Sequence, residues 1–301
     1  MGSPAAAGER NPVSAPSVSV IVPCYNSGRF LDQLLSSLAA QTFRAFEVIV
    51  VDDGSSEAET LAKLAELPTE IRVVRQPNAG LAAARNTGFR NARANMVLPL
   101  DCDDMLEPSY LAETAGALRA APADVGFVFT HMQLCGALEG SFSTKFDRFD
   151  QLFVNRLPYC MLFRKSAWAA VGGYDETMRD GSEDWEFNIR LAQANFCGLE
   201  IAKPLFVYAV RPEGMLLSKT ARLQGTMWRR IRRKHRDLYQ PSMLVGLWRK
   251  ENRNWSSALR GLMLLALAKS LPERGYNALC FRFMRLARGW RVRCGHFSAR
   301  A

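Results

Sequence analysis

Short apolar runs alternate with amphipathic stretches over the first hundred residues. Runs of β-branched and other apolar residues predict four buried strands, at residues 18–23, 46–51, 71–74 and 96–100. Apolar residues at helical spacing predict three intervening helices, at residues 29–41, 57–66 and 80–92. This alternation predicts an α/β fold in which helices flank both faces of a mostly parallel central sheet.

The alternation weakens after Leu106, and the C-terminal part has a different character. Further strands are expected at residues 125–129, 159–163 and 205–210, and further helices at residues 166–171 and 185–195. Beyond Arg222 the pattern is helical and basic to the end. We therefore expect a flexible lead over residues 1–16, one main domain over residues 17–220 and a helical basic C-terminal extension over residues 221–301.

The basic excess lies mainly in that extension. The chain has 39 Lys and Arg against 29 Asp and Glu, a net charge of +10, with arginines dense over residues 222–236 and 282–300. Such a surface suits phosphorylated ligands, nucleic acid or an anionic membrane. No nucleic-acid-binding module is apparent, so we predict no nucleic acid partner. Residues 260–271 and 281–290 mix apolar residues with arginine, which suits helices lying on a membrane surface. It equally suits helices packed on the domain with solvated arginines, and both readings stay open.

Cysteine usage and hydropathy bear on the cellular location. The seven cysteines are scattered without a CxxC pair, which predicts free thiols in a reducing compartment. No stretch reaches the roughly 20 uncharged apolar residues that span a bilayer, and residues 1–16 lack the apolar segment of a secretory signal. We expect a cytoplasmic protein, with peripheral attachment to the inner face of the membrane as a further option.

Three carboxylates crowd the loop after the fourth predicted strand, at Asp101, Asp103 and Asp104. Like charges this close repel one another unless a cation neutralises them. Hard divalent cations such as Mg²⁺ and Mn²⁺ prefer carboxylate oxygen and share their shell with substrate phosphates. The loop is therefore a candidate site for a metal-bound diphosphate. The alternative is a solvated acidic turn that caps the next helix.

Two further motifs end predicted strands. Asp52-Asp53-Gly54-Ser55 follows the second strand, where a carboxylate can accept hydrogen bonds from a ribose hydroxyl or a base N–H. Pro23-Cys24-Tyr25-Asn26 ends the first strand, where Tyr25 can stack on a base and Asn26 can bond its edge. Each motif is also ordinary turn chemistry, so neither is specific alone.

Adjacent carboxylates at Glu183 and Asp184 precede the helix predicted from Trp185. Acidic residues are common in the first helical turn because they complement the helix dipole. The alternative is catalytic: Asp184 acts as a general base that removes the proton of an acceptor hydroxyl.

The order of the motifs is far more specific than any one of them. They are Val18 to Asn26, Asp52 to Ser55, Asn78-Ala79-Gly80-Leu81 with Ala84-Arg85-Asn86-Thr87-Gly88, Leu100 to Asp104, Val171 to Glu176 and Glu183-Asp184-Trp185. This ordered set, over roughly residues 17–220, resembles family 2 of the inverting glycosyltransferases. The resemblance implies a GT-A fold, in which a Rossmann-like nucleotide-binding sheet is merged with an acceptor-binding part.

The resemblance implies a donor site made of Pro23, Tyr25, Asn26, Asp53, Arg85, Asp101, Asp103 and Arg211. Pro23 and Tyr25 would line the base, and Asp53 would bind the base or ribose. Asp101 would touch the ribose or sugar, while Asp103 would ligate Mn²⁺ or Mg²⁺. Arg211 would meet the diphosphate.

The resemblance also assigns the remaining acidic residues. Asp184 matches the catalytic base, with Glu183 beside it positioning the loop or the acceptor. Asp104 would support the metal loop, and Trp185 would support the base. A base opposite the leaving group suffices for inversion, because the reaction is a single displacement at the anomeric carbon without an enzyme nucleophile.

The implied function is transfer of one sugar from a nucleotide-diphosphate sugar, with UDP the commonest nucleotide of the family, to a hydroxyl of a glycan or lipid-linked acceptor. Processive polysaccharide synthases of the family carry QxxRW, whereas this chain has Gln224, Met227 and Trp228 at those positions. The departure favours a non-processive enzyme.

Two other functions stay open. A sugar-nucleotide pyrophosphorylase would need a glycine- and lysine-rich triphosphate loop near the first strand, which residues 22–28 do not supply. A catalytically inactive sugar- or nucleotide-binding relative would have no need for Asp53, Asp103 and Asp184, all of which are intact.

Overall fold

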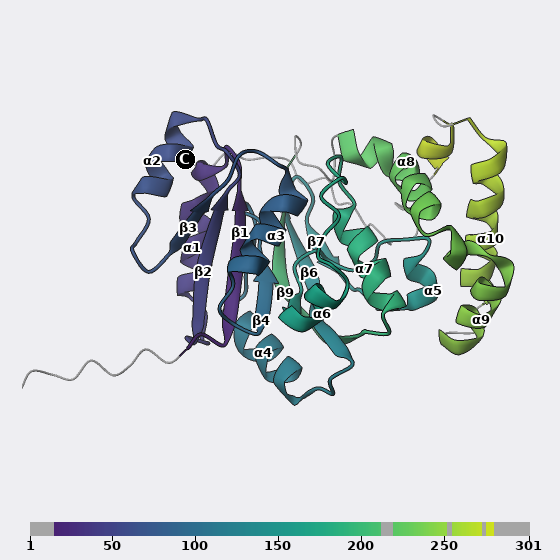
Figure 1. The fold of residues 1–301 in the computed structure, drawn as a ribbon, viewed down its shortest axis with the longest axis horizontal. Coiled ribbons are helices and arrows are strands. Elements are labelled where there is room, and N and C mark those ends of the chain that lie inside the picture. The colour runs from purple at the N-terminus through teal and green to yellow at the C-terminus, as the bar shows by residue number, and fades with distance from the viewer. Residues whose placement is uncertain (1–14, 212–218, 252–254, 273–274, 280–301) are drawn as a thin grey trace, which may run out of the picture.

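The computed structural model describes residues 15–211, 219–251, 255–272 and 275–279, and the fold is shown in Figure 1. Residues 1–14 of the predicted lead and the arginines over residues 282–300 therefore lie outside the described residues. In the described part, nine strands form one sheet in the order β3-β2-β1-β4-β8-β6-β9-β5, with β7 on β6. The strands are β1 Val18–Cys24, β2 Phe46–Asp52, β3 Arg72–Arg75, β4 Met96–Pro99, β5 Met105–Leu106, β6 Val125–Gly136, β7 Gly140–Phe142, β8 Leu162–Arg164 and β9 Cys197–Val210.

The sheet is mixed, and the part formed by β1, β2, β3 and β4 is parallel as predicted. β1 pairs in parallel with β2 and β4, β2 with β3, and β6 with β9. The remaining pairs, β4–β8, β5–β9, β6–β7 and β6–β8, are antiparallel. The helices are η1 Gly28–Phe30, α1 Leu31–Ala39, α2 Ala58–Ala65, α3 Leu81–Asn91, α4 Tyr110–Ala120, α5 Arg148–Gln151, α6 Lys165–Ala170, α7 Glu183–Gln193, α8 Lys219–Lys234, η2 Arg236–Tyr239, α9 Pro241–Glu251 and α10 Trp255–Ser270.

The first hundred residues match the predicted elements to within one or two residues, apart from the 3-10 turn η1 ahead of α1. Later predictions fit less well. The strand predicted at 205–210 begins eight residues earlier, at Cys197. Lys203 and Pro204 interrupt its apolar pattern, and the pairing of β9 with β6 accommodates them through register shifts around His131. The strand predicted at 159–163 covers only Leu162–Arg164, and helix α4 has no counterpart among the predictions.

Two apolar clusters cover the two faces of the sheet. On one face, α1, α2 and α4 pack over the side chains of Val18, Val20, Val22 and Cys24. On the other, α3, α6 and α7 pack over Ile21, Ile49 and Val51. A third cluster joins α5 and α7 to α8, α9 and α10, which include the buried Trp228 and Ile231. Figure 1 shows α9 and α10 at the end of the molecule opposite β3.

Close packing of α3 explains the glycines of two sequence motifs. A Cβ at Gly88 would lie 1.9 Å from a methyl of Ile21, so only glycine lets α3 approach β1 this closely. Asn86 accepts hydrogen bonds from the backbone N–H of Tyr174 and the indole of Trp168, and donates to the carbonyl of Tyr174. Gly173 has φ of +74°, which favours glycine. These contacts fix α3, and with it Arg85, against the segment that leads to Asp184.

Candidate active site

The predicted polar residues gather at the carboxyl ends of β1, β2 and β4, where parallel α/β sheets bind ligands. Asp53 directly follows β2 and is 3% exposed. Its Oδ1 accepts hydrogen bonds from Gln76 Nε2 at 2.6 Å and from the Ala79 N–H at 2.9 Å, and its Oδ2 accepts from the Gly80 N–H at 2.8 Å. The Asp53 carboxylate therefore fixes the loop that leads into α3.

The motif after β1 has one exposed and one structural member. Tyr25 is 50% exposed, so its ring is accessible at the end of β1. Asn26 adopts a φ of 49°, a conformation that asparagine tolerates better than most residues. Its Oδ1 accepts from the N–H groups of Ser56 and Glu57 at 2.8 and 3.1 Å. That oxygen therefore orders the loop before α2.

Arg85 lies between the two acidic loops. Its side chain is 1% exposed. Nη2 donates to both carboxylate oxygens of Asp101, at 2.9 and 3.0 Å, and Nη1 donates to Glu183 Oε1 at 2.6 Å. The guanidinium also lies 4.7 Å from the centroid of the Tyr159 ring. Arg85 is thus the support that holds Asp101 and Glu183 in place, and its charge is already paired.

The burial of these groups sets their electrostatics. Burial and the nearby Asp184 raise the pKa of Glu183 to about 7, against the attraction of Arg85. The pKa of Arg85 rises well above its usual value because the attraction of Asp101 and Glu183 outweighs the cost of burying the guanidinium. A buried cation between carboxylates leaves neither charge uncompensated, and loss of one partner is costly.

Asp103 and Asp104 point in different directions from the same turn. Asp104 is 1% exposed; its carboxylate accepts a hydrogen bond from the Tyr159 hydroxyl and another from the Ala209 N–H at 2.7 Å. Asp103 is 33% exposed at its side chain and lies 3.2 Å from Nε of Arg211. Burial and the neighbouring Asp101 raise the pKa of Asp103. Asp103 is therefore the most exposed carboxylate of the turn, followed by Asp101 at 24%.

The carboxylates of the acidic turn suit a divalent cation that also binds a substrate. Within the described ranges no group of three or more His, Cys, Asp and Glu could hold a metal ion without other ligands. Mg²⁺ and Mn²⁺ are commonly held by one or two carboxylates together with substrate phosphates and water. The partly exposed Asp103, beside a second carboxylate that raises its pKa, matches that chemistry.

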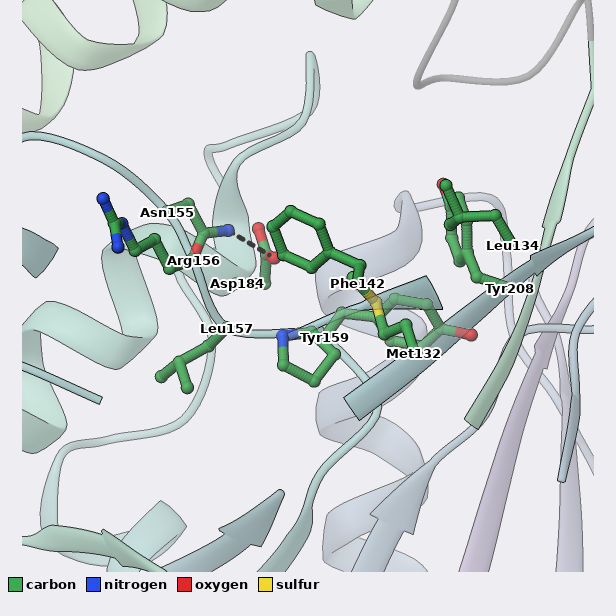
Figure 2. A pocket seen from close by; sticks show the side chains of 10 residues that line it. Met132, Leu134, Phe142, Asn155, Arg156, Leu157, Tyr159, Asp184 and Tyr208 are labelled. Atoms are coloured by element: carbon green, nitrogen blue, oxygen red, sulfur yellow. Dashed lines mark hydrogen bonds between the residues drawn. The ribbon is translucent and has the colours of Figure 1, made fainter. Parts of the chain in front are cut away.

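Asp184 lies in the first turn of α7, directly after Glu183, and lines a cavity of about 130 Å³. The walls are largely apolar and come from β6, β7, β9 and the loop before β8, with Met132, Leu134, Phe142, Leu157, Pro158, Tyr159 and Tyr208. Asn155 Nδ2 donates to Asp184 Oδ2 at 2.8 Å, and Figure 2 shows the two side chains pointing toward each other. The neighbouring Trp185 donates from its indole N–H to the Gln151 carbonyl at 2.7 Å, which anchors the start of α7.

Sequence reasoning missed Asn155, Tyr159 and Gln76. Tyr159 donates to Asp104 and accepts from the Asp101 N–H at 3.0 Å, so it connects both ends of the acidic turn. Asn155 holds Asp184, and Gln76 holds Asp53. None belongs to a motif, because each acts across a distance in sequence of more than twenty residues. Their only local signal is a polar residue beside a hydrophobic segment, which is common in loops.

Replacing Arg85 with methionine should destabilise the protein strongly at neutral pH. The buried Glu183 and the partly exposed Asp101 would lose their cation, and breaking a buried pair costs about 3–5 kcal/mol in free energy of unfolding. Without Arg85, Glu183 would lose the attraction that opposes its raised pKa, so the loss should shrink as pH falls and Glu183 is protonated. Urea unfolding at pH 7 and pH 5 would measure it. Arg90→Met, on an exposed face of the same helix, is the control, and equal losses for both variants would contradict the assigned role.

Comparison with known families agrees with this geometry. The family model described as "Glycosyl transferase family 2" matches residues 19–168. The match includes the segments after β1, β2 and β4 and ends before Glu183, Asp184 and Arg211.

A 110-residue segment is 42% identical to "Glycosyltransferase GlyA" of Streptococcus pneumoniae, over 36% of this chain and 16% of that protein. An uncharacterized glycosyltransferase of Haemophilus influenzae is 28% identical over 199 residues, which is 62% of this chain and 66% of that one. The chain thus spans less than two thirds of the length of these relatives.

Solved structures share the fold. The mannosyltransferase PcManGT of Pyrobaculum calidifontis, in complex with GDP-Man and Mn²⁺, superposes with a TM-score of 0.57 at 19% identity, over 91% of this chain and 81% of that one. Residues 1–349 of S. aureus TarS, in complex with UDP-GlcNAc, give a TM-score of 0.57 at 19% identity, over 90% and 92% of the two chains. The GT-A architecture expected from the sequence is therefore confirmed.

Proposed function

Because the chain belongs to glycosyl transferase family 2, we propose that it moves one sugar residue from a nucleotide-diphosphate sugar to a hydroxyl of a glycan or lipid-linked acceptor, with inversion at the anomeric carbon. UDP is the nucleotide we propose first. Structural relatives bound UDP-GlcNAc in one case and GDP-Man with Mn²⁺ in another, so both nucleotide classes belong in the test.

The observation that carries the proposal is the buried Arg85. It joins Asp101, next to the accessible Asp103, to Glu183, next to Asp184. One guanidinium thus couples the loop that would hold the leaving diphosphate to the loop that would activate the acceptor. Displacement at an anomeric carbon requires both functions in one place, and a nucleotide-binding protein without catalysis requires only the first.

Three kinds of contact would hold the nucleotide sugar. Pro23 and the exposed Tyr25 would line the base, with Asp53 and its loop beside the base or ribose. Asp103 would hold Mn²⁺ or Mg²⁺, and Arg211 would approach the diphosphate from the other side. A bound cation there would offset the negative charge of the departing diphosphate. Arg85 would act from beneath the site by holding Asp101 in place, and its Nε is buried without a hydrogen-bond partner.

The acceptor side would use Asp184 as general base. Its carboxylate would take the proton of the acceptor hydroxyl as that oxygen bonds to the anomeric carbon and the nucleoside diphosphate leaves. Asn155 donates to one carboxylate oxygen of Asp184, and the Asp184 side chain lines the cavity. The apolar and aromatic walls around Asp184 would receive the acceptor and exclude water.

A thermal-shift screen with UDP-, GDP- and dTDP-sugars, each with and without Mn²⁺, tests the proposal. We expect one nucleotide class to raise the melting temperature only with Mn²⁺, since a ligand that binds the folded state stabilises it. Slow release of the free nucleoside diphosphate from that donor should follow. No stabilisation by any donor would contradict the donor-site assignment. Binding without release, with a range of sugar acceptors, would favour the inactive relative. Formation of a nucleotide sugar from a sugar phosphate and nucleoside triphosphate would favour the pyrophosphorylase.

We also propose that α10 rests on an anionic membrane surface. No helix in the described ranges has both the length and the apolar character to cross a bilayer. Yet Trp255, Leu259 and Leu262 are 76%, 70% and 62% exposed, and their spacing places them on one helix face. The exposed Arg249 and Lys250 end the preceding helix, and the chain carries a net charge of +10. An apolar row beside basic residues is typical of interfacial helices.

Replacing Trp255, Leu259 and Leu262 together with serine should reduce binding to vesicles of phosphatidylcholine and phosphatidylglycerol by at least about tenfold. Partial burial of each side chain contributes on the order of 1 kcal/mol. Vesicle flotation would measure it, with Leu199→Ser, a partly exposed residue on β9, as the control. Equal flotation of the triple variant and the parent protein would show that α10 does not contact the membrane.

A further inference from the structure

Two cysteines lie directly beneath the donor loop. We propose that Cys24 and Cys102 form a redox-sensitive dithiol, and that its oxidation to a disulfide reduces nucleotide binding. The second half of this inference rests on the proposed function, because it takes Asp101 and Asp103 as donor-site residues. The first half depends only on the arrangement of the two thiols.

The strand register brings the two residues together. β1 and β4 pair in parallel with Val18 opposite Met96 and Ile21 opposite Pro99. The Leu100 N–H continues this ladder by donating to the Ile21 carbonyl at 2.9 Å. Beyond Pro99 the chain leaves β4 and turns, and the turn brings Cys102 Sγ to the carbonyl oxygen of Pro23, the residue before Cys24. A disulfide between the two cysteines would need roughly 4.4–6.8 Å between their Cα atoms.

The side chains point to the same face of the sheet. Cys24 and Cys102 both belong to the apolar cluster under α1, α2 and α4, and they are 1% and 4% exposed. Cys102 Sγ lies 3.1 Å from the carbonyl oxygen of Pro23, the residue before Cys24. Cys102 also lowers the pKa of the Cys24 thiol, which agrees with this proximity. Closure therefore needs rotation of side chains and a small approach of two adjacent strand ends.

Another buried cysteine provides a comparison. Cys160 belongs to the same cluster, but its Sγ contacts the Tyr110 hydroxyl at 3.9 Å. It is therefore a matched residue for tests of specificity: equally buried, on the same side of the sheet, and in contact with a group that cannot form a disulfide.

A disulfide would act on the donor site because of its neighbours. Cys102 stands between Asp101 and Asp103, and Cys24 precedes Tyr25. Bringing the two sulfurs to the bonded distance of about 2.05 Å would draw the acidic turn toward β1. Asp101 and Asp104 are fixed by Arg85 and Tyr159, so the strain would fall on the turn that presents Asp103. A displacement of about 1 Å in such a group can cost on the order of 100-fold in rate.

Hydrogen peroxide supplies a balanced route. One thiol is oxidised to a sulfenic acid while the peroxide is reduced to one water and the oxygen is transferred to sulfur. The second thiol then attacks that sulfur, forming the S–S bond and releasing a second water. In total, two thiols and one peroxide give one disulfide and two waters. Dithiothreitol reverses the reaction by thiol–disulfide exchange. Because both thiols are buried, we expect slow oxidation that Mn²⁺ and UDP retard further.

Mass spectrometry after peroxide treatment and alkylation of the remaining thiols tests the dithiol. Trypsin places Cys24 in the peptide of residues 11–29 and Cys102 in the peptide of residues 94–119. We expect these two peptides joined, two hydrogens lighter than their sum, and separated by dithiothreitol. Cys102→Ser should abolish the cross-link and Cys160→Ser should leave it. Cross-links to other cysteines, or only sulfinic and sulfonic acids at Cys24 and Cys102, would overturn the pairing.

Titration calorimetry with UDP and Mn²⁺ tests the consequence. Oxidation should weaken binding at least about tenfold, which corresponds to roughly 1.4 kcal/mol, and dithiothreitol should restore it. Cys24→Ser and Cys102→Ser proteins should bind UDP with or without peroxide. A joined peptide with unchanged affinity would overturn the regulatory role. If the reduced protein binds no nucleotide, both the proposed function and the regulatory role of the disulfide are contradicted. Formation of the Cys24–Cys102 disulfide is tested separately, by the cross-linked peptides.

Discussion

Asp184→Asn should reduce sugar transfer by about 100- to 10,000-fold, the range that a positioned general base contributes, without weakening nucleotide binding. The amide is nearly the same size as the carboxylate, and its oxygen can still accept the hydrogen bond of Asn155 Nδ2. The substitution therefore removes basicity and leaves the cavity and the start of α7 in place. Asp103 and Arg211 belong to a different part of the site, so donor affinity should be preserved.

Transfer is measured as release of nucleoside diphosphate with acceptor, and donor affinity by calorimetry on the same preparation. Asp180→Asn, an exposed acid in the loop before α7, controls for the loss of one negative charge. A transfer rate within a few fold of the parent protein would exclude Asp184 as the base. Loss of donor binding in step with transfer would instead make Asp184 a structural residue.

The parallel half of the fold was predictable because its signals are local. Each strand of the series β1, β2, β3 and β4 is a short apolar run, and each is separated from the next by an amphipathic helix. The second half lacks this regularity. β9 carries Lys203 and Pro204 inside a strand and is stabilised by its pairing with β6, which no pattern along β9 itself encodes.

The site was predictable as a set of residues but not as a set of contacts. Asp103 and Asp184 are accessible to a ligand, as the resemblance implied, but their assigned roles remain predictions. Arg85 was expected to contact the sugar donor, and in the structure its guanidinium forms ion pairs with Asp101 and Glu183. Asp53 likewise binds three donors of its own chain. A sequence motif gives the residue types and their spacing. Whether a charged side chain faces a ligand or supports a neighbouring residue depends on how the fold packs around it.

The same distinction explains why Tyr159 and Asn155 escaped notice. Both lie in the loop between α5 and β8, where the sequence predicted only the start of a strand at Tyr159, and both act on carboxylates in other segments. A buried carboxylate such as Asp104 must find a donor or be neutralised, so its burial implies a partner such as Tyr159. That implication becomes visible only once the position of Asp104 in the fold is known. Support residues of this kind are therefore inferred from burial rather than from sequence.

Asp103→Ala should abolish the part of UDP binding that depends on Mn²⁺. Asp103 has the most exposed side chain of the acidic turn, at 33% against 24% for Asp101, and Asp104 is buried. Loss of an outer-shell partner of a metal ligand typically costs about 10- to 100-fold in affinity, so loss of the ligand itself should exceed this. Calorimetric titration of UDP with and without Mn²⁺ gives both components separately.

UDP binding measured without Mn²⁺ distinguishes a metal ligand from a residue that only stabilises the loop. Arg211 pairs with Asp103 at 3.2 Å, so removal of that carboxylate leaves its guanidinium available to the diphosphate. Metal-free UDP binding by Asp103→Ala should therefore be unchanged or slightly stronger, while Mn²⁺ adds nothing to it. Glu107→Ala, an exposed acid shortly after the same turn, should keep the full Mn²⁺ effect. Equal loss of both components would indicate a disrupted loop, and an unchanged Mn²⁺ effect would remove Asp103 from the metal site.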